Sequence, residues 1–142
     1  MQILKKMLSR SVGSVDLASL VLRLVFCGLM IFNHAFLKLT LFGERPESFP
    51  DPVGIGPSTS FYLVIFAEII CASLVMVGLF TRLALVPLLI AMSVALFRVQ
   101  WGNDLMDKEL PLLYLSVWTA LMFLGPGRWS LDSRLKLLEK YR

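Results

Sequence analysis

One stretch of the sequence decides the fold: residues 17–39 read LASLVLRLVFCGLMIFNHAFLKL. A helix that crosses a bilayer needs about 20 mostly apolar residues, so this run is long enough to span the membrane despite its polar interruptions. Asp16 precedes the run, and Asp favours a helix N-terminus. Arg23 interrupts the run, which argues against a cleaved signal peptide. We therefore predict a retained transmembrane helix here.

Three further apolar runs follow. With the flanking residues that bring the shorter runs to the interface, they cover residues 61–80, 83–100 and 109–125. The chain of 142 residues is 57% hydrophobic and has a mean hydropathy of +0.76, which is too apolar for a soluble domain. We predict an all-α membrane protein, a single transmembrane domain over residues 1–142 that forms a four-transmembrane-helix bundle.

The connections between these runs differ in length. Residues 43–60 read GERPESFPDPVGIGPSTS, and their repeated Pro and Gly disfavour both helix and strand, so we predict an irregular loop between the first two spans. Loops of this length are often functional. Only Thr81 and Arg82 interrupt the apolar sequence between the second and third runs, which predicts a tight helical hairpin.

The distribution of basic residues predicts the orientation in the membrane. The N-terminal segment, the turn at Arg82 and the C-terminal tail carry about nine Lys and Arg, against about four on the other side. Both termini are therefore expected in the cytoplasm. Apolar residues near each terminus predict amphipathic helices that lie on the inner leaflet or dock on a partner subunit. They are Ile3, Leu4, Met7 and Leu8 in the first segment, and Leu131, Leu135 and Leu138 in a C-terminal helix at about 131–141.

The first run places its polar residues on one helical face. Arg23, Cys27, Met30, His34 and Lys38 follow one another at steps of four, three, four and four. A charge in the hydrocarbon region costs at least about 2.5 to 3.5 kcal/mol, so we expect this face to point into the bundle and to find polar partners there. Lys38, near the outer end, is also able to extend to the membrane surface.

Glu68 in the second span is the expected counter-charge. In an antiparallel hairpin its depth in the membrane falls between those of Arg23 and His34. One hypothesis is that Arg23 and Glu68 form a structural ion pair that fixes the register of the helices. The other is that Glu68 and His34 exchange protons at a ligand pocket in the outer half of the bundle.

No metal site is predicted. His34 is the only histidine, so a haem with two His ligands cannot be built within the chain, and no Cys, His or carboxylate cluster has zinc spacing. His34 is then either a hydrogen-bonded structural residue or a proton relay. Cys27 and Cys71 form an intramembrane thiol pair if their faces meet, although buried cysteines usually act as small apolar side chains.

Arg98, Trp101 and Glu109 bracket the second outer loop. They are either interface anchors or, if the first loop folds over them, the rim of a pocket around His34 and Lys38. The net charge of +4 comes from residues at the chain ends and span edges, not from a basic stripe with interleaved aromatic residues. Nucleic acid is therefore not an expected partner.

Three pieces of the sequence carry a family resemblance: LVLRLVFCGLMIFNHAFLKL in the first span, AEIICASLVMVGLFTRLALV across the hairpin and LGPGRWSLD after the fourth span. Over about residues 17–132 the chain resembles the DoxX family of small four-helix bacterial and archaeal membrane proteins. Members commonly have Arg, then His-Gly and Lys, in the first span. Here Arg23, His34 and Lys38 match, and Ala35 replaces the Gly. The resemblance implies a multi-pass protein of a bacterial or archaeal cell (inner) membrane.

The resemblance also implies a functional setting. The family takes its name from a subunit associated with archaeal thiosulfate:quinone oxidoreductase and terminal quinol oxidase, and other members are linked to redox or sulfur stress complexes. We therefore expect a membrane subunit of a quinone-linked redox complex that binds a quinone or another lipid-soluble molecule in the outer half of the bundle. The candidates for ligand binding or proton exchange are Arg23, His34, Lys38, Glu68, Arg98 and Trp101.

Several features of this function stay open. No intrinsic cofactor is expected, and electrons would come from a protein partner in a membrane complex; a homo-oligomer is the other expected assembly. The alternatives are a non-catalytic assembly or anchoring subunit and a small-molecule transporter, so whether the chain is an enzyme is undecided. The polar face of the first span discriminates between them. If Glu68 and its neighbours fill that face, no room remains for a ligand.

Overall fold

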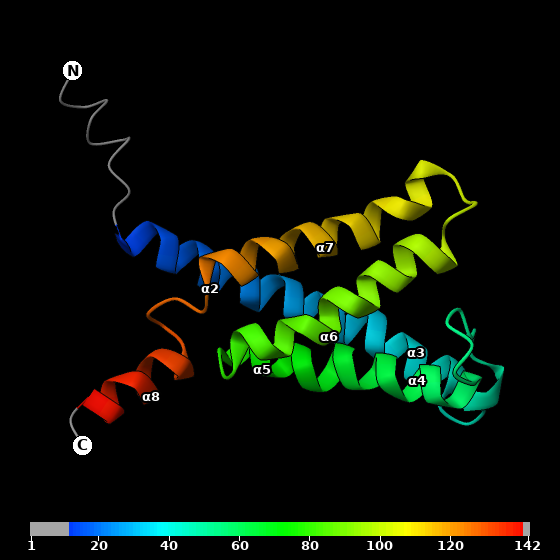
Figure 1. Cartoon of the computed structure of the whole chain (residues 1–142), viewed down its shortest axis with the longest axis horizontal. Coiled ribbons are helices and arrows are strands. Elements are labelled where there is room, and N and C mark those ends of the chain that lie inside the picture. The colour runs from blue at the N-terminus through cyan, green and yellow to red at the C-terminus, as the bar shows by residue number, and fades with distance from the viewer. Residues whose placement is uncertain (1–11, 141–142) are drawn as a thin grey trace.

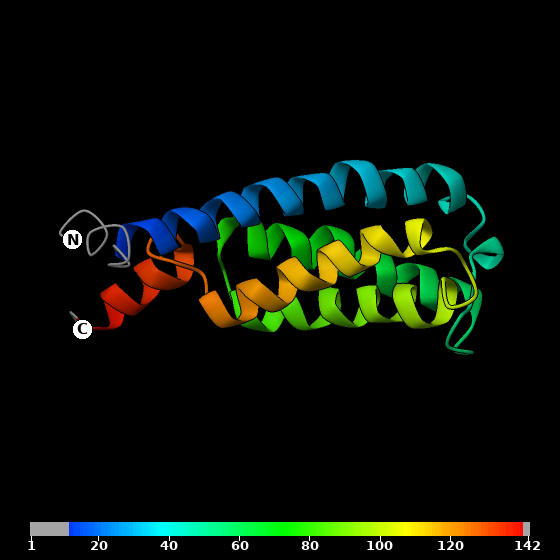
Figure 2. The same ribbon diagram turned by 90° about the horizontal axis from the view of Figure 1, so that it is seen from above.

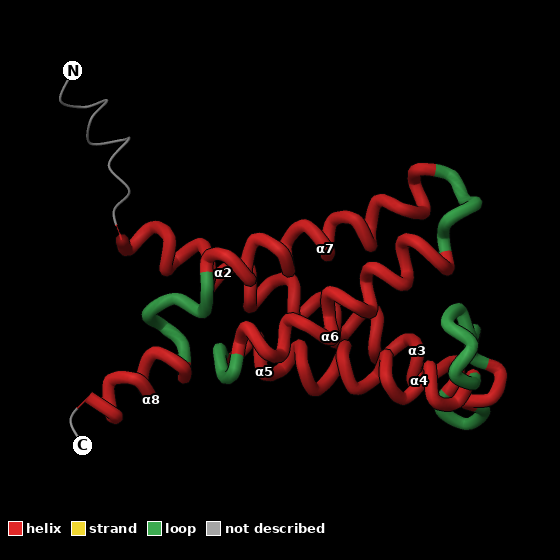
Figure 3. Tube along the Cα trace, viewed as in Figure 1, coloured by secondary structure: helices red, strands yellow, loops and turns green. Residues whose placement is uncertain are grey.

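The computed structural model describes residues 12–140, and the elements in this range are all helical (Figures 1 and 3). The first long helix comprises α2 (Val12–Leu29), η1 (Met30–Ala35) and α3 (Phe36–Phe42). The second comprises α4 (Pro57–Ile65), η3 (Phe66–Cys71) and α5 (Ala72–Val77), and the third comprises α6 (Thr81–Val94) and η4 (Ala95–Val99). The others are α7 (Leu105–Leu124), α8 (Leu131–Lys140) and a 3-10 turn, η2 (Pro46–Ser48), in the first loop.

Three helices of the described chain are long and apolar enough to cross a membrane: Gly13–Phe42, Pro57–Val77 and Thr81–Val99. α7 is a fourth long helix, of 20 residues, whose first turns carry the charged sequence Asp107-Lys108-Glu109. The predicted all-α membrane class is therefore confirmed as a helical membrane bundle. Of the predicted amphipathic ends, the C-terminal helix is present as α8. The N-terminal residues Ile3, Leu4, Met7 and Leu8 and the side chain of Leu138 lie outside the described residues.

The long helices lie side by side in one elongated bundle (Figures 1 and 2). One end of the bundle, which we call the terminal end, contains the start of α2, the turn between α5 and α6, and the end of α7. α8 lies beyond it. At the opposite end, the loop end, lie the end of α3, residues 43–56 and residues 100–104. α6 packs against α5 and α7, and α2 packs against α5 and α7.

The interior between these helices is closely packed. Leu85 and Leu88 on α6, Trp118 and Leu121 on α7, and Ala72 on α5 are fully buried and belong to one core cluster. Lipid is as apolar as these side chains, so close packing and polar contacts, rather than removal of apolar surface from water, hold helices together in a bilayer. The polar contacts within the bundle therefore decide how its two ends are built.

The second long helix begins earlier than the apolar run suggests, at Pro57 rather than residue 61. Asp51 explains the difference, because its carboxylate accepts hydrogen bonds from the backbone N–H groups of Gly54 (3.0 Å), Ile55 (3.1 Å) and Gly56 (2.8 Å) and from Ser60 Oγ (2.8 Å). Partial burial of this carboxylate acts to raise its pKa, but the four hydrogen bonds outweigh burial and hold the pKa of Asp51 below its ordinary value.

The hairpin between the second and third helices turns at Gly78 rather than at Thr81 and Arg82, which instead begin α6. Gly78 has a φ of +74°, and a Cβ at this position would lie 2.2 Å from Arg23 Nη1 and 2.5 Å from Ser130 Cβ. Both the backbone conformation and the lack of space require glycine. The predicted tight hairpin is correct, and its turn lies three residues earlier than expected.

Candidate functional site

Arg23 is fully buried, and it does not pair with Glu68 as predicted. Its Nη2 donates to the carbonyl of Trp129 (3.0 Å), and its Nη1 donates to the carbonyls of Met76 (3.3 Å) and Val75 (3.5 Å). The last carbonyls of a helix have no intrahelical donor and form its negative end, so a cation is favoured there. Arg23 thus stabilises the C-terminus of α5, and the predicted ion pair between Arg23 and Glu68 is wrong.

The same end contains the residues of LGPGRWSLD, 124–132, that the sequence singles out. Asp132 caps α6 by accepting hydrogen bonds from the backbone N–H groups of Phe80 (2.8 Å) and Thr81 (3.0 Å) and from Thr81 Oγ1 (2.9 Å). Ser19 Oγ donates to the carbonyl of Gly125 (2.8 Å). We call Ser19, Arg23, Gly78, Asp132 and the segment 124–132 the terminal clasp. It joins α2, α5, α6 and α8 through local polar contacts.

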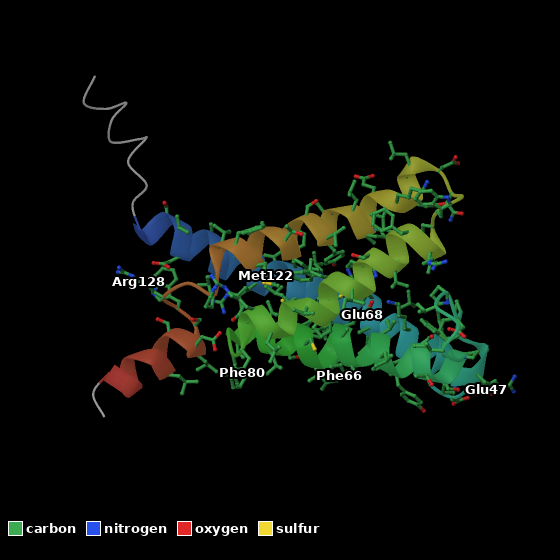
Figure 4. The ribbon with its side chains drawn as sticks, in the orientation of Figure 1. Glu47, Phe66, Glu68, Phe80, Met122 and Arg128 are labelled. Atoms are coloured by element: carbon green, nitrogen blue, oxygen red, sulfur yellow. The ribbon has the colours of Figure 1, made fainter. Side chains whose placement is uncertain are left out.

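The loop-end half of the bundle contains a partly open cavity of about 310 Å³. All three of the longest apolar helices contribute to its wall, together with α7 and the first loop. Its lining comprises Met30, His34, Lys38, Phe42, Phe49, Pro50, Pro52, Val64, Glu68, Ala91, Met92, Val94, Ala95, Val99, Gln100, Leu110, Pro111 and Tyr114. Figure 4 shows Glu68 inside the bundle, whereas Phe66 on the same helix points outward.

Lys38 and Glu68 form an ion pair at this cavity, with Lys38 Nζ donating to Glu68 Oε1. Glu68 is 0% exposed, while the Lys38 side chain is 27% exposed. Lys38 therefore turns inward to the carboxylate instead of extending only toward the membrane surface. The sequence placed the carboxylate at a polar face correctly but assigned it the wrong cation, because the open carbonyls that hold Arg23 cannot be read from a pattern.

Two buried oxygens at the cavity have no hydrogen bond within the described part of the chain: Glu68 Oε2 and Gln100 Oε1. Gln100 is a site residue that the sequence reasoning missed. Gln100 continues the steps of four from Leu88, Met92 and Leu96, so helical spacing places it on the same face as these residues, which the structure buries. The candidates on either side of it, Arg98 and Trp101, are exposed and do not line the cavity.

The helices are wound more loosely where they meet the cavity. His34 lies in the π-helical segment η1, Glu68 lies in η3, and η4 ends directly before Gln100. The Gln100 N–H donates to the carbonyl of Ala95 (3.0 Å), a bond five residues back along the chain. Such segments are rare and occur frequently at functional sites, because the extra residue in the turn redirects side chains.

Aromatic rings form one wall of the cavity. The Tyr114 ring meets His34 edge to face, with centroids 5.4 Å apart, and packs at 5.7 Å against Trp118. Edge-to-face contacts of this kind hold both rings in place. His34 therefore lies in the cavity wall beside Tyr114, and Tyr114 is a second lining residue that the sequence reasoning did not single out.

Cys27 and Cys71 are buried free thiols in the apolar core and do not line the cavity. Their surroundings fit a packing role, the more ordinary of the two predicted ones. In the described part of the chain, no three His, Cys, Asp or Glu side chains come close enough to hold a metal ion.

An apolar groove of about 390 Å³ adjoins the cavity on the outer surface of the bundle. It is lined by Phe49, Pro52, Val53, Ile55, Ser60, Leu63, Val64, Phe66, Ala67, Pro87, Ile90, Ala91 and Val94. Five of these residues also line the cavity: Phe49, Pro52, Val64, Ala91 and Val94. We call it the lateral groove. Leu63, Phe66 and Ile90 are about half exposed there, so the groove lies on the surface that would face lipid.

These features define a small helical membrane protein with a partly buried Lys–Glu ion pair beside a cavity between its helices. The chain belongs to the DoxX family, whose model matches residues 18–101. An uncharacterized membrane protein of Mycobacterium tuberculosis, Rv3486, is 35% identical, with 78% of this chain and 80% of that protein covered. An uncharacterized protein of Haemophilus influenzae is 30% identical over 67% of this chain and 66% of its own length. No solved structure matches the chain.

Proposed function

We propose that this protein binds a quinone, or a lipid-soluble molecule of similar chemistry, in the loop-end cavity as a subunit of a quinone-linked redox complex. In this proposal the four long helices all cross a bacterial cell membrane, and both termini face the cytoplasm. The carrying observation is that a cavity with a buried ion pair, Lys38 and Glu68, adjoins an apolar groove on the outer surface. A quinone-like molecule, with a polar head and an apolar tail, fits this combination of a cavity and a groove.

The polar face of the first span favours this proposal over a purely structural subunit. Its terminal half is filled, because Arg23 is occupied by backbone carbonyls. Its loop-end half is not filled, because a cavity of about 310 Å³ remains there, with His34, Lys38 and Glu68 in its lining. An anchoring subunit needs no such space.

The transporter alternative has less support. The expected cationic pocket of His34, Lys38 and Arg98 is not assembled, because Glu68 pairs with Lys38 and Arg98 does not line the cavity. An anion would therefore meet a carboxylate rather than a group of cations.

The proposed chemistry needs two electrons and two protons to convert a quinone into a hydroquinone. A partner protein supplies the electrons. Glu68 and His34 are the groups that hold protons beside the head, and Lys38 positions the Glu68 carboxylate through the ion pair. The chain's part is thus to bind the head, to orient it and to exchange protons with it.

Binding can be measured through Trp118, which packs against Tyr114 in the cavity wall. Replacing Trp101 and Trp129 by Phe leaves Trp118 as the single tryptophan of the three in the sequence. In lipid nanodiscs, decylbenzoquinone should then quench Trp118 fluorescence to a saturating level. If quenching instead rises linearly with the quinone concentration, the quinone only partitions into the lipid, and the proposal is wrong.

A matched pair of variants locates the site. Ala95→Phe fills the cavity and should weaken quinone binding at least about tenfold. Ala120→Phe adds the same side chain on the exposed face of α7 and should leave binding unchanged. Equal binding by both variants would place the quinone elsewhere and would favour the assembly role.

A further inference from the structure

The unpartnered atoms at the cavity share one property: they accept hydrogen bonds. Glu68 Oε2 and Gln100 Oε1 are buried there without a donor in the described residues. The side-chain donor atoms that are buried without a partner in the described part of the chain, Arg23 Nε and Trp118 Nε1, belong to residues that do not line the cavity. A buried acceptor without a donor costs free energy, so a ligand that brings donors is favoured over one that brings more acceptors.

The charges at the cavity favour a neutral head group. Lys38 and Glu68 compensate each other, so a cationic ligand would meet Lys38 and an anionic ligand would meet Glu68. Each case adds an uncompensated charge to a low-dielectric site, which is costly. Hydroxyl groups supply donors without a net charge.

The walls favour an aromatic head with an apolar tail. Rings of His34, Phe42, Phe49 and Tyr114 line the cavity, and rings pack well against a flat aromatic head. The lateral groove starts at Phe49 and Val64, which line both spaces, and its lining has a single polar side chain, Ser60. A chain attached to the head would thus lie against apolar residues.

We infer that the cavity selects the hydroxylated form of a tailed aromatic molecule, a phenol or hydroquinone, over the corresponding ether or quinone. The inference rests on the proposed function and names the form of the ligand: two hydroxyl groups donate to Glu68 Oε2 and Gln100 Oε1. A site that binds the reduced form more tightly shifts a bound quinone toward hydroquinone by the same factor. The protein would therefore hold the reduced carrier and release the oxidised one.

Calorimetric titration of the full chain in nanodiscs, with empty nanodiscs as the blank, tests the inference. The first pair of probes is para-decylphenol and its methyl ether, which differ only in the donor. The phenol should bind about tenfold more tightly than the ether, which corresponds to about 1.4 kcal/mol. Decylhydroquinone, kept reduced without oxygen, should bind more tightly than the phenol because it brings two donors, and more tightly than decylbenzoquinone.

Variants of Gln100 link this preference to the structure without touching the ion pair. Gln100→Leu removes one acceptor and should reduce the preference of the site for hydroquinone over phenol to about twofold or less. Gln100→Glu keeps acceptor oxygens there and should preserve that preference. Loss of the preference in both variants would assign the Gln100 side chain a donor role and overturn the inference.

The outcomes separate this inference from the function on which it rests. If decylbenzoquinone binds and the phenol and its ether bind equally, the donor inference is wrong and the quinone site stands. Tighter binding of the ether has the same meaning. If none of the four compounds binds, both proposals are wrong.

Discussion

The two ends of the bundle differ in how they hold a cation of the first long helix. At the terminal end, Arg23 donates to three backbone carbonyls from two segments. At the loop end, Lys38 pairs with one oxygen of Glu68 and leaves the other oxygen without a partner beside a cavity. Burial of charge alone therefore does not identify a site. What distinguishes the two ends is whether the unsatisfied atom lies at a cavity: among the described residues Arg23 Nε also lacks a partner, but Arg23 does not line the cavity, whereas Glu68 does.

The difference also explains which residues shape each end. In the terminal clasp, Gly78 brings the turn so close to Arg23 and Ser130 that no space remains. At the loop end, π-helical turns at His34 and Glu68 redirect side chains toward an open volume. The terminal end is thus built for packing, and the loop end is built to leave a space with polar atoms at its wall.

The largest effect on stability is expected from Lys38→Met, which leaves the Glu68 carboxylate buried without its cation. Removing one partner of a buried ion pair costs about 3 to 5 kcal/mol. Adding Glu68→Gln to this variant removes the second charge and should restore most of the lost free energy of unfolding. Unfolding of detergent-solubilised protein by SDS, followed by far-UV circular dichroism, measures both.

Lys108→Met, at a half-buried lysine in the first turns of α7 that does not line the cavity, serves as the control for loss of a lysine. It should change the free energy of unfolding by no more than about 0.5 kcal/mol. A double variant as unstable as Lys38→Met would mean that the ion pair is part of the fold, like the terminal clasp. In that case the contrast between the two ends would fail.

A smaller loss of stability is expected from Gly78→Ala at the terminal end. The new Cβ would lie 2.2 Å from Arg23 Nη1 at a φ of +74°, and the strain and overpacking together cost about 2 to 3 kcal/mol. Gly28→Ala is the matched control, because its Cβ meets nothing closer than Met76 Cε at 4.0 Å. That control should be neutral or more stable by up to about 1 kcal/mol.

Ligand binding sharpens this test. The Gly78→Ala protein that remains folded should bind decylbenzoquinone within about twofold of the unmodified affinity, because the clasp does not line the cavity. A larger loss of affinity would show that the two ends are coupled.

Apolar run length was enough to predict the membrane class and the approximate helices, because few residue types are tolerated in lipid. Helix ends were harder to place. The second helix starts at Pro57 because Asp51 collects donors from a Pro- and Gly-rich stretch, and it ends before Gly78 because of a close approach to Arg23. The first cause depends on how the loop folds around Asp51. The second depends on a contact with Arg23, which is far from Gly78 in the sequence, so neither could be predicted from the local sequence.

The candidate site was predicted in part for a similar reason. Helical spacing placed His34, Lys38 and Glu68 on polar faces, and these residues do line one cavity. The pairing was wrong because Arg23 has competing partners in backbone carbonyls, which no residue pattern records. Gln100 shares a helical face with Leu88, Met92 and Leu96, but the candidates chosen from this segment were the charged and aromatic residues Arg98 and Trp101. Both of these are exposed.

The smallest effect is expected from Asp51→Asn in the first loop, and it depends on pH. Partial burial acts to raise the pKa of Asp51, but four hydrogen bonds lower it below the ordinary value of 3.8. The stabilisation of the loop is therefore fully present above pH 3.8 and is lost as the pH falls through the lower pKa of the folded protein. Hydrogen exchange at the amides of Gly54, Ile55 and Gly56, corrected for the intrinsic pH dependence, measures this loss.

In Asp51→Asn the three amides should be less protected at neutral pH, and the step in protection below pH 3.8 should disappear. Glu47→Gln, on the exposed turn η2 of the same loop, removes a carboxylate without touching the hydrogen bonds of Asp51 and should keep the step. Because Phe49 and Pro52 lie close to Asp51 in the loop and line both the cavity and the lateral groove, loss of the Asp51 hydrogen bonds should also weaken quinone binding slightly. Unchanged protection in Asp51→Asn would mean that the loop is held by its apolar contacts alone.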